Sequence, residues 1–385
     1  MIPRLLLALV LGVTAGAAAL AQSPDQIRAA VGQLGDFDFA VRLEASRLLR
    51  RAPPEITVPE LLQAARGHED TYVQFRAAVL LYGFGDAQAS AFFQEALDLS
   101  NDRVRAAAYD YFEHAPDPKL VPKLLAALDL EVSEFARPAL VRALAAHDAD
   151  VAVQARLVSD IARGEGYFRG AVIEALGDFT AAYAVAALIP IAAEPGPLQD
   201  DALLALGKIG DERALATLAT VQLAASPPLQ PIVSATRCLL DIDCADHLSY
   251  VIEALEGSAQ VAPGERQQIL RNAATGLAAL AMRGQRDALD ALVDAGILAG
   301  DRGRAPIALA LGTVALRNPA VVIGMLSERK DLKPTLLLLR DAFDMLDEDL
   351  AEERFYVQIR DRYRTSAVAS RDQEIAEQLI QFLEF

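Results

Sequence analysis

One pattern recurs along the chain every 30 to 32 residues, and it constrains the fold more than any other feature. Each copy has an apolar residue, then Arg or Gln, then a small or apolar residue three positions on, then Ala or Leu three and four positions later. Clear copies begin at Val41, Val73, Val104, Ala136, Phe168, Leu198 and Gly303, and weaker ones near Ile232 and Leu270. A period kept through six consecutive units predicts an array of stacked units rather than two or three ordinary domains.

Each unit is expected to contain two helices. The small and apolar positions of the pattern fall on one helical face, which predicts a stripe that packs against a neighbouring helix. Asp70, Asn101 and Ser133 stand three residues before the pattern, where a helix N-cap is expected. Between units the chain reads Gly-Asp or Pro, as at Gly177 and Gly210, which is typical of a helix end. No stretch alternates with period two, so no sheet is expected.

The segment 202–218 (ALLALGKIGDERALATL) resembles the consensus of HEAT-like repeats, in the short-period form found in phycobilin lyases. The resemblance extends over roughly residues 25–326 and implies an α-solenoid. Such repeats serve scaffolds, adaptors and a few enzymes, so the resemblance does not fix a function. Bilin attachment is not implied, because nothing beyond the repeat matches. Deoxyhypusine hydroxylase has a similar fold but needs several His-Glu pairs for iron, and here only His68-Glu69 occurs.

Both ends of the chain differ from the repeats. Residues 1–21 read as a signal peptide, with Arg4 before an apolar stretch and an Ala-Leu-Ala sequence ending at Ala21. The alternative is an uncleaved anchor, but residues 5–21 are short for a membrane span and contain two glycines. We therefore expect a periplasmic or secreted protein with no membrane span in the mature chain.

The predicted fold is an all-α, right-handed solenoid of about nine two-helix units in residues 22–340, with a helical C-terminal cap in 341–385. The acidic stretch 341–353 precedes a run of arginines and aromatic residues in 354–364. We expect the two to neutralise each other across an antiparallel helix pair that caps the array. The alternative is that the basic, aromatic run binds phosphates or anionic lipid.

The charge of the chain excludes one class of ligand. It has 53 acidic against 36 basic residues, a formal net charge of −17, which argues against nucleic acid as a partner. No G-x-S-x-G, H-E-x-x-H, P-loop or G-x-G-x-x-G motif occurs, so no catalytic residue, cofactor or metal site is predicted. His114 and His147 fall at similar positions of successive units, where a cation beside a helix C-terminus is an ordinary feature.

The arginines of the repeat are interpreted as a structural ladder that ties adjacent units together. Glu131 and Glu265, each six residues before such an arginine, are the expected partners of Arg137 and Arg271. The alternative is that this row of arginines contacts a ligand.

Cys238 and Cys244, the only cysteines, are separated by a turn. Six residues apart, they are expected to form a disulfide in an oxidising compartment. The alternative is a pair of buried free thiols.

The expected function is a non-enzymatic scaffold of the cell envelope that binds a protein partner. The second helices should line the concave side, where Arg76, Asp110, Arg142 and Glu174 are predicted to be exposed and to contact the partner. One alternative is an enzyme or enzyme accessory, lyase-like or acting on polysaccharide, with its site in the groove. Another is a structural homo-oligomer built through the faces of the array.

Overall fold

The structure is a computed structural model that describes residues 23–85, 87–258, 264–346 and 348–385. The predicted signal peptide and its cleavage site lie outside these residues. The described chain is helical throughout and contains no strand. This confirms the predicted all-α solenoid.

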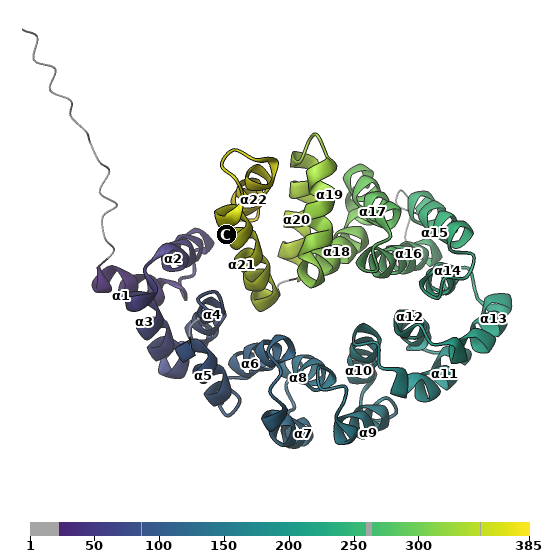
Figure 1. Cartoon of the computed structure of the whole chain (residues 1–385), viewed down its shortest axis with the longest axis horizontal. Helices are drawn as coiled ribbons and strands as arrows, with labels where there is room; N and C mark the ends of the chain where they lie inside the picture. The colour runs from purple at the N-terminus through teal and green to yellow at the C-terminus, as the bar shows by residue number, and fades with distance from the viewer. Residues whose placement is uncertain (1–22, 86, 259–263, 347) are drawn as a thin grey trace, which may run out of the picture.

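Helices of successive units form two layers (Figure 1). The outer layer consists of α1 (Pro24–Gln33), α3 (Pro54–Gly67), α5 (Ala87–Ala96), α7 (Val121–Leu130), α9 (Val151–Asp160), α11 (Val185–Ala193), α13 (Leu215–Ala224), α15 (Cys244–Ser258), α17 (Arg286–Leu298) and α19 (Pro319–Glu328). The inner layer consists of α2 (Phe39–Arg51), α4 (Thr71–Tyr82), α6 (Asp102–His114), α8 (Ala136–Ala145), α10 (Gly166–Asp178), α12 (Gln199–Ile209), α14 (Gln230–Leu239), α16 (Glu265–Met282), α18 (Asp301–Arg317) and α20 (Lys333–Leu346). Short 3₁₀ turns, Pro118–Leu120, Ala182–Ala184 and Glu212–Ala214, lead into α7, α11 and α13. The described residues thus form ten helix pairs, one more than predicted.

Two of the three predicted caps are confirmed, while Ser133 accepts a hydrogen bond from the N–H of Phe135, the residue before α8, and does not cap that helix. The side chain of Asp70 accepts a hydrogen bond from the backbone N–H of Tyr72, and Asn101 accepts from the N–H groups of Arg103 and Val104. Gly210 ends α12 in the left-handed conformation, with φ 77°. Gly177 lies in the last turn of α10, which ends at Asp178 as predicted to within a residue, but the left-handed residue that follows the helix is Thr180, with φ 52°.

The arginine ladder is confirmed in part. Arg105 binds the Glu131 carboxylate at 2.7 and 2.9 Å and also the carbonyl of Leu99. Glu131 therefore pairs with the arginine of the preceding unit, and not with Arg137 as expected. The Arg137 guanidinium instead lies 3.8 Å from the centre of the Phe168 ring.

The C-terminal segment does more than cap the last unit, because it closes the array into a ring (Figure 1). Its helices are α21 (Asp349–Thr365) and α22 (Arg371–Phe382). Helix α21 contacts both α18 and α4, and its Leu350 belongs to the apolar core of the N-terminal units. The two ends of the described chain therefore pack against each other.

The boundary predicted at residue 341 falls inside α20, which runs unbroken from Lys333 to Leu346. The predicted antiparallel pairing of the acidic stretch with the arginine run is wrong. Much of the acidic stretch and the arginines share one helix, α21, and their charges pair with other helices. Glu353 pairs with Arg50, and Arg354 pairs with Asp110.

No single helix among the described residues is both long and apolar enough to cross a membrane. Residues 303–317 and α19 pass such a test only as a pair, and they meet at a bend of 110°.

Candidate partner-binding surface

The four residues predicted to contact a partner lie on successive inner helices, α4, α6, α8 and α10, but the expectation that all are exposed is wrong. Arg76 pairs with Asp349, and Asp110 pairs with Arg354, both on α21. Arg142 is held within the inner layer by two carboxylates. Glu174 alone is exposed. For Arg76 and Asp110 the reason is ring closure, since α21 occupies the part of the concave side that they face, whereas Arg142 is engaged by the neighbouring inner helices α6 and α10.

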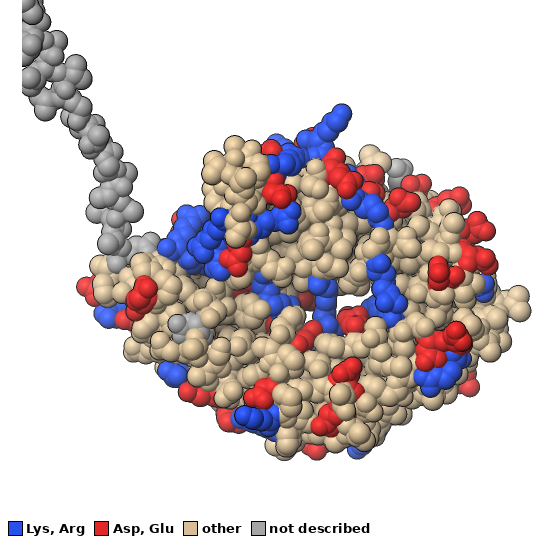
Figure 2. All heavy atoms as spheres, viewed as in Figure 1, with Lys and Arg blue, Asp and Glu red and all other residues tan. Residues whose placement is uncertain are grey.

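Ion pairs line the interior of the ring, and one of them reaches across it; Figure 2 shows charged side chains around a central opening. The Arg142 guanidinium contacts Glu113 at 2.8 Å and Asp178 at 2.8 Å, and Lys208 contacts Asp178 at 2.7 Å. Burial acts to raise the pKa of Asp178, but the charges of Lys208 and Arg142 outweigh it and lower the pKa to about 2. Arg317, on α18, lies 3.6 Å from Glu113 on the opposite arm of the ring. These side chains therefore already have charged partners within the ring.

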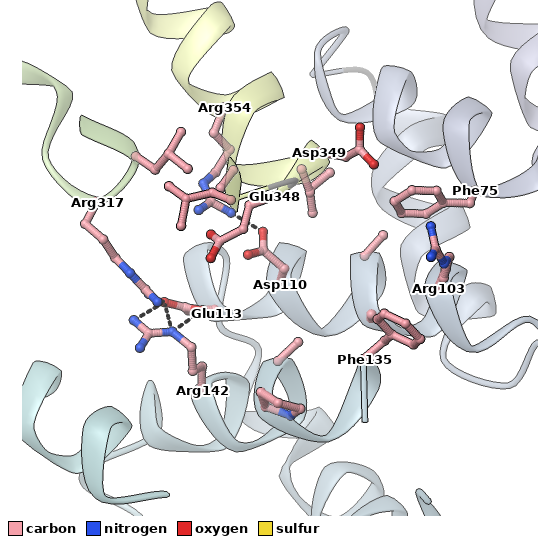
Figure 3. A pocket seen from close by; sticks show the side chains of 18 residues that line it. Phe75, Arg103, Asp110, Glu113, Phe135, Arg142, Arg317, Glu348, Asp349 and Arg354 are labelled. Atoms are coloured by element: carbon pink, nitrogen blue, oxygen red, sulfur yellow. Dashed lines mark hydrogen bonds and ion pairs between the residues drawn. The ribbon is translucent and has the colours of Figure 1, made fainter. Parts of the chain in front are cut away.

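A cavity of about 430 Å³ lies between α6, α8, the end of α18 and the start of α21 (Figure 3). This volume is in the range of sites for small molecules or short peptide segments. Four arginines and four carboxylates line it, together with apolar side chains: Arg103, Arg142, Arg317, Arg354, Asp110, Glu113, Glu348, Asp349, Pro138, Leu316, Leu346 and Leu350. The formal charges of its walls therefore balance.

Arg103 differs from the other arginines of this cavity. Its guanidinium carbon lies 4.9 Å from the centre of the Phe135 ring and 5.6 Å from that of Phe75, so two phenyl rings flank it (Figure 3). Within the described residues Arg103 forms no ion pair, whereas Arg142, Arg317 and Arg354 each have a carboxylate partner. The cavity thus contains one cation that is held in place but not neutralised.

Aromatic side chains continue along the same edge of the ring, where the inner helices begin. The set consists of Phe39, Tyr72, Phe75, Phe135 and Tyr167, together with Arg103, and is called the aromatic edge below. Phe39, Phe135 and Tyr167 are 59%, 62% and 46% exposed. Asn101 bonds to Thr71 and Ser133 to Asp102, so the starts of α4, α6 and α8 lie next to one another. Exposed aromatic rings beside arginine are characteristic of protein-binding surfaces.

The aromatic edge was not among the surfaces predicted from the sequence, although the repeat contains a signal for it. The position directly before the repeat pattern reads Tyr72, Arg103, Phe135 and Tyr167 in four successive units. Equivalent positions of stacked repeats lie side by side, so this column of the sequence predicts an exposed aromatic row.

A second cavity of about 440 Å³, between α12, α16 and α18, contains a carboxylate with an altered pKa. Burial raises the pKa of Asp201 to about 6, and the negative charges of Asp200 and Glu174 act in the same direction, against Lys208. Arg271 also lines this cavity. Asp201 keeps part of its surface exposed to solvent, so the effect is moderate: its ionised form is less favourable in the folded chain than in the unfolded one.

We expect Asp201→Asn to stabilise the protein above pH 6 and to change little at pH 4. Because the folded-state pKa is raised, stability is lost as pH rises from the unfolded value near 4 through 6. The gain should be about 1 kcal/mol at pH 7.5, since solvent in the ring screens a partly exposed group. Urea unfolding of both proteins at pH 4.5 and 7.5 measures it. An equal effect at the two pH values would contradict this assignment.

One group of three potential metal ligands occurs among the described residues. It consists of Asp110, Glu113 and His114, with one ligand atom from each lying within 4.8 Å of the others. Arg354 already pairs with Asp110, and Arg142 with Glu113, which disfavours a further cation there. His147 is not part of this group.

The sulfur atoms of Cys238 and Cys244 are bonded in the structure, and their Cα atoms are 4.0 Å apart. Cys238 lies near the end of α14 and Cys244 begins α15, as the sequence predicts. The turn between α14 and α15 therefore brings the two cysteines together.

We expect the purified mature protein to contain no free thiol after denaturation without reductant. Cys238→Ser should lower the free energy of unfolding, because the disulfide no longer constrains the unfolded chain. The decrease should be only about 2 kcal/mol, since the loop that the disulfide closes is small. Thiol titration and urea unfolding check the two parts. Two titratable thiols in unreduced protein would overturn the disulfide.

Comparison with known proteins supports the repeat assignment. A family profile described as HEAT repeats matches residues 27–113 and 58–145. This confirms HEAT repeats in the first units, while the short-period form stays a prediction. No curated protein matches the chain.

Similar solved structures include a Kap95p complex with RanGDP, at 15% identity and a TM-score of 0.38, covering 93% of this chain and 54% of that one. Kap121p bound to Nup53p is similar at 11% identity and a TM-score of 0.31, over 94% of this chain and 46% of that one. A structure from work on cadherin and beta-catenin matches at 13% identity and a TM-score of 0.30, over 95% and 96% of the two chains. The chain spans about half the length of the first two.

Proposed function

We propose that this chain is an exported, non-enzymatic scaffold of the cell envelope that binds a protein partner through the aromatic edge. The observation that carries the proposal is the exposure of Phe39, Phe135 and Tyr167 at the starts of the inner helices α2, α8 and α10. Exposed aromatic rings cost free energy in water, and burying them against a partner recovers it. HEAT-repeat solenoids are typical protein-interaction scaffolds, which favours the same reading.

The ring also favours an edge over the concave groove as the binding surface. Arg76, Asp110 and Arg142 are engaged by carboxylates or arginines of the same chain. A partner in the groove would have to displace those pairs, whereas the aromatic edge is open in the closed ring. The mixed charge near the edge suits a folded protein or peptide rather than a polyanion.

Capture from an envelope extract tests the proposal. Tagged mature protein is compared with the triple variant F39A/F135A/Y167A, and bound proteins are identified by mass spectrometry. The matched control is L130A/L223A/L298A, which removes three exposed leucines from the outer helices or their ends. We expect the edge variant to capture at least tenfold less partner than the wild-type protein. The control variant should capture as much as the wild type. Equal loss in both, or none in the edge variant, would refute the aromatic edge as the binding surface.

The export part of the proposal has its own test. The signal-like residues 1–21 favour cleavage after Ala21, so the mature chain should begin at Gln22. Intact-mass analysis of protein from the soluble envelope fraction measures this directly. A full-length chain that stays in the cytoplasm would contradict export.

A further inference from the structure

We propose that Arg103 is the anchor for a single carboxylate of the partner, which enters the cavity between α6, α8 and α21. This inference deepens the proposed function, since it names the group that the partner presents. The chemical class is a peptide carboxylate, either an acidic side chain or a chain terminus. The rest of the cavity shows why one such group is suited to this place.

Arg103 is held in place before any ligand binds. The rings of Phe75 and Phe135 flank its guanidinium, which restricts the conformations of the side chain. A guanidinium presents these donors in the spacing of a carboxylate, so two parallel hydrogen bonds form without further ordering of the side chain. The Arg103 side chain therefore loses less conformational entropy on binding than a mobile arginine would.

The charges of the cavity leave one arginine and one carboxylate without an ion pair among the described residues. Arg142, Arg317 and Arg354 are occupied by Glu113 or Asp110, and Asp349 is occupied by Arg76. Arg103 is the arginine still available, while burial raises the pKa of the Glu348 carboxyl and so disfavours its negative form. A single carboxylate beside Arg103 is therefore matched by that guanidinium. A phosphate or other polyanion would meet the remaining carboxylates of the walls, Glu348 among them, without enough cations to offset them.

Part of the cavity lining is apolar. Pro138, Leu316 and Leu350 form walls beside the charged groups. A carboxylate attached to an aliphatic or aromatic side chain can therefore bury apolar surface there while its oxygens contact Arg103. A small hydrophilic anion such as acetate gains less from these walls.

The test uses purified protein and small probes, so it does not depend on finding the partner. Saturation-transfer NMR compares 3-phenylpropionate with 3-phenylpropionamide, which differ only in the charged group. We expect the acid to bind wild-type protein at least tenfold more tightly than the amide, and to weaken as salt is raised. Equal binding of acid and amide would overturn the proposal.

Substitutions locate the binding. Arg103→Gln should lose the preference for the acid, and Arg103→Lys should keep only part of it, because lysine keeps the charge but not the planar fork. Arg271→Gln is the matched control, since Arg271 is exposed and lines the other cavity. Circular dichroism and thermal melting of each variant verify folding. If Arg103→Gln folds and still prefers the acid, the site lies elsewhere.

The source of the carboxylate is distinguished with tripeptides. Three peptides are compared. Acetyl-Ala-Leu-Phe with a free C-terminus carries a terminal carboxylate, its C-terminal amide carries none, and acetyl-Ala-Leu-Asp-amide carries a side-chain carboxylate. Binding of either carboxylate peptide, with loss in the plain amide, supports the proposal and identifies the source. If the aromatic-edge variant loses its partner while Arg103→Gln captures it fully, the scaffold function stands and the carboxylate anchor fails.

Discussion

Glu353→Ala is expected to lower the free energy of unfolding by about 3–5 kcal/mol, or to detach the C-terminal helices in a separate early transition. The Glu353 side chain is 1% exposed, and its Oε2 accepts hydrogen bonds from Arg50 at 2.9 and 2.7 Å. The Arg50 guanidinium lies 5.0 Å from the centre of the Tyr356 ring and 5.6 Å from that of Phe385. Removing the carboxylate would leave a buried arginine without a counterion, which is the costly step.

Urea unfolding, together with small-angle scattering, measures this effect. The pair joins residues 303 apart in sequence, so its loss should also enlarge the radius of gyration as the ring opens. Glu95→Ala is the matched control, because Glu95 pairs with Arg66 at 2.9 Å on the surface, where such a pair contributes at most about 1 kcal/mol. The double variant R50M/E353M should recover much of the loss, since two apolar side chains replace a buried pair. A Glu353→Ala cost no larger than that of Glu95→Ala would show that the ring does not depend on this pair.

The repeat made the local structure predictable. Each unit carries its own caps, apolar stripe and turn residues within about 31 residues, and these fix where helices begin and which face is buried. The caps at Asp70 and Asn101 and the link from Arg105 to Leu99 follow from such local signals. The tenth pair, α19 and α20, was missed because its sequence departs from the pattern.

Ring closure was not predictable in the same way. The contacts of Glu353 with Arg50, and of Asp349 with Arg76, join segments more than 270 residues apart, and no periodicity marks them. Ring closure also changed which of the predicted site residues are free to bind a partner. Arg76, Asp110 and Arg142 have the spacing of groove residues, but free side chains in an open groove were assumed. In the structure α21 pairs with Arg76 and Asp110, and the neighbouring inner helices pair with Arg142. Tyr72, Arg103, Phe135 and Tyr167 of the aromatic edge, by contrast, follow from one column of the repeat and needed only the alignment of successive units, whereas Phe39 and Phe75 stand outside that column.

Gly177→Leu is expected to destabilise the protein by about 3 kcal/mol, because α10 and α12 approach too closely at this point for a side chain. A Cβ atom at Gly177 would lie 2.8 Å from the Cα of Ala205 and 3.0 Å from its Cβ. A Cα atom cannot move aside as a flexible side chain does, so the helices must separate and the core around Leu176 must loosen. Glycine is otherwise a poor helix former, and its presence inside α10 is explained by this contact.

Gly324→Leu provides the control for this prediction. Gly324 is exposed inside α19, and a Cβ there would meet nothing within 4 Å. Leucine should therefore raise stability at this position by about 0.5 kcal/mol through helix propensity alone. Both substitutions replace a helical glycine by the same residue, with Gly177 in the last turn of α10 and Gly324 in the middle of α19, so most of the difference between them is the cost of the close approach. Urea unfolding of the two variants measures this difference in the free energy of unfolding. Similar values for the two variants would mean that α10 and α12 can move apart without loss of stability. Their close contact would then not be what holds successive units in register.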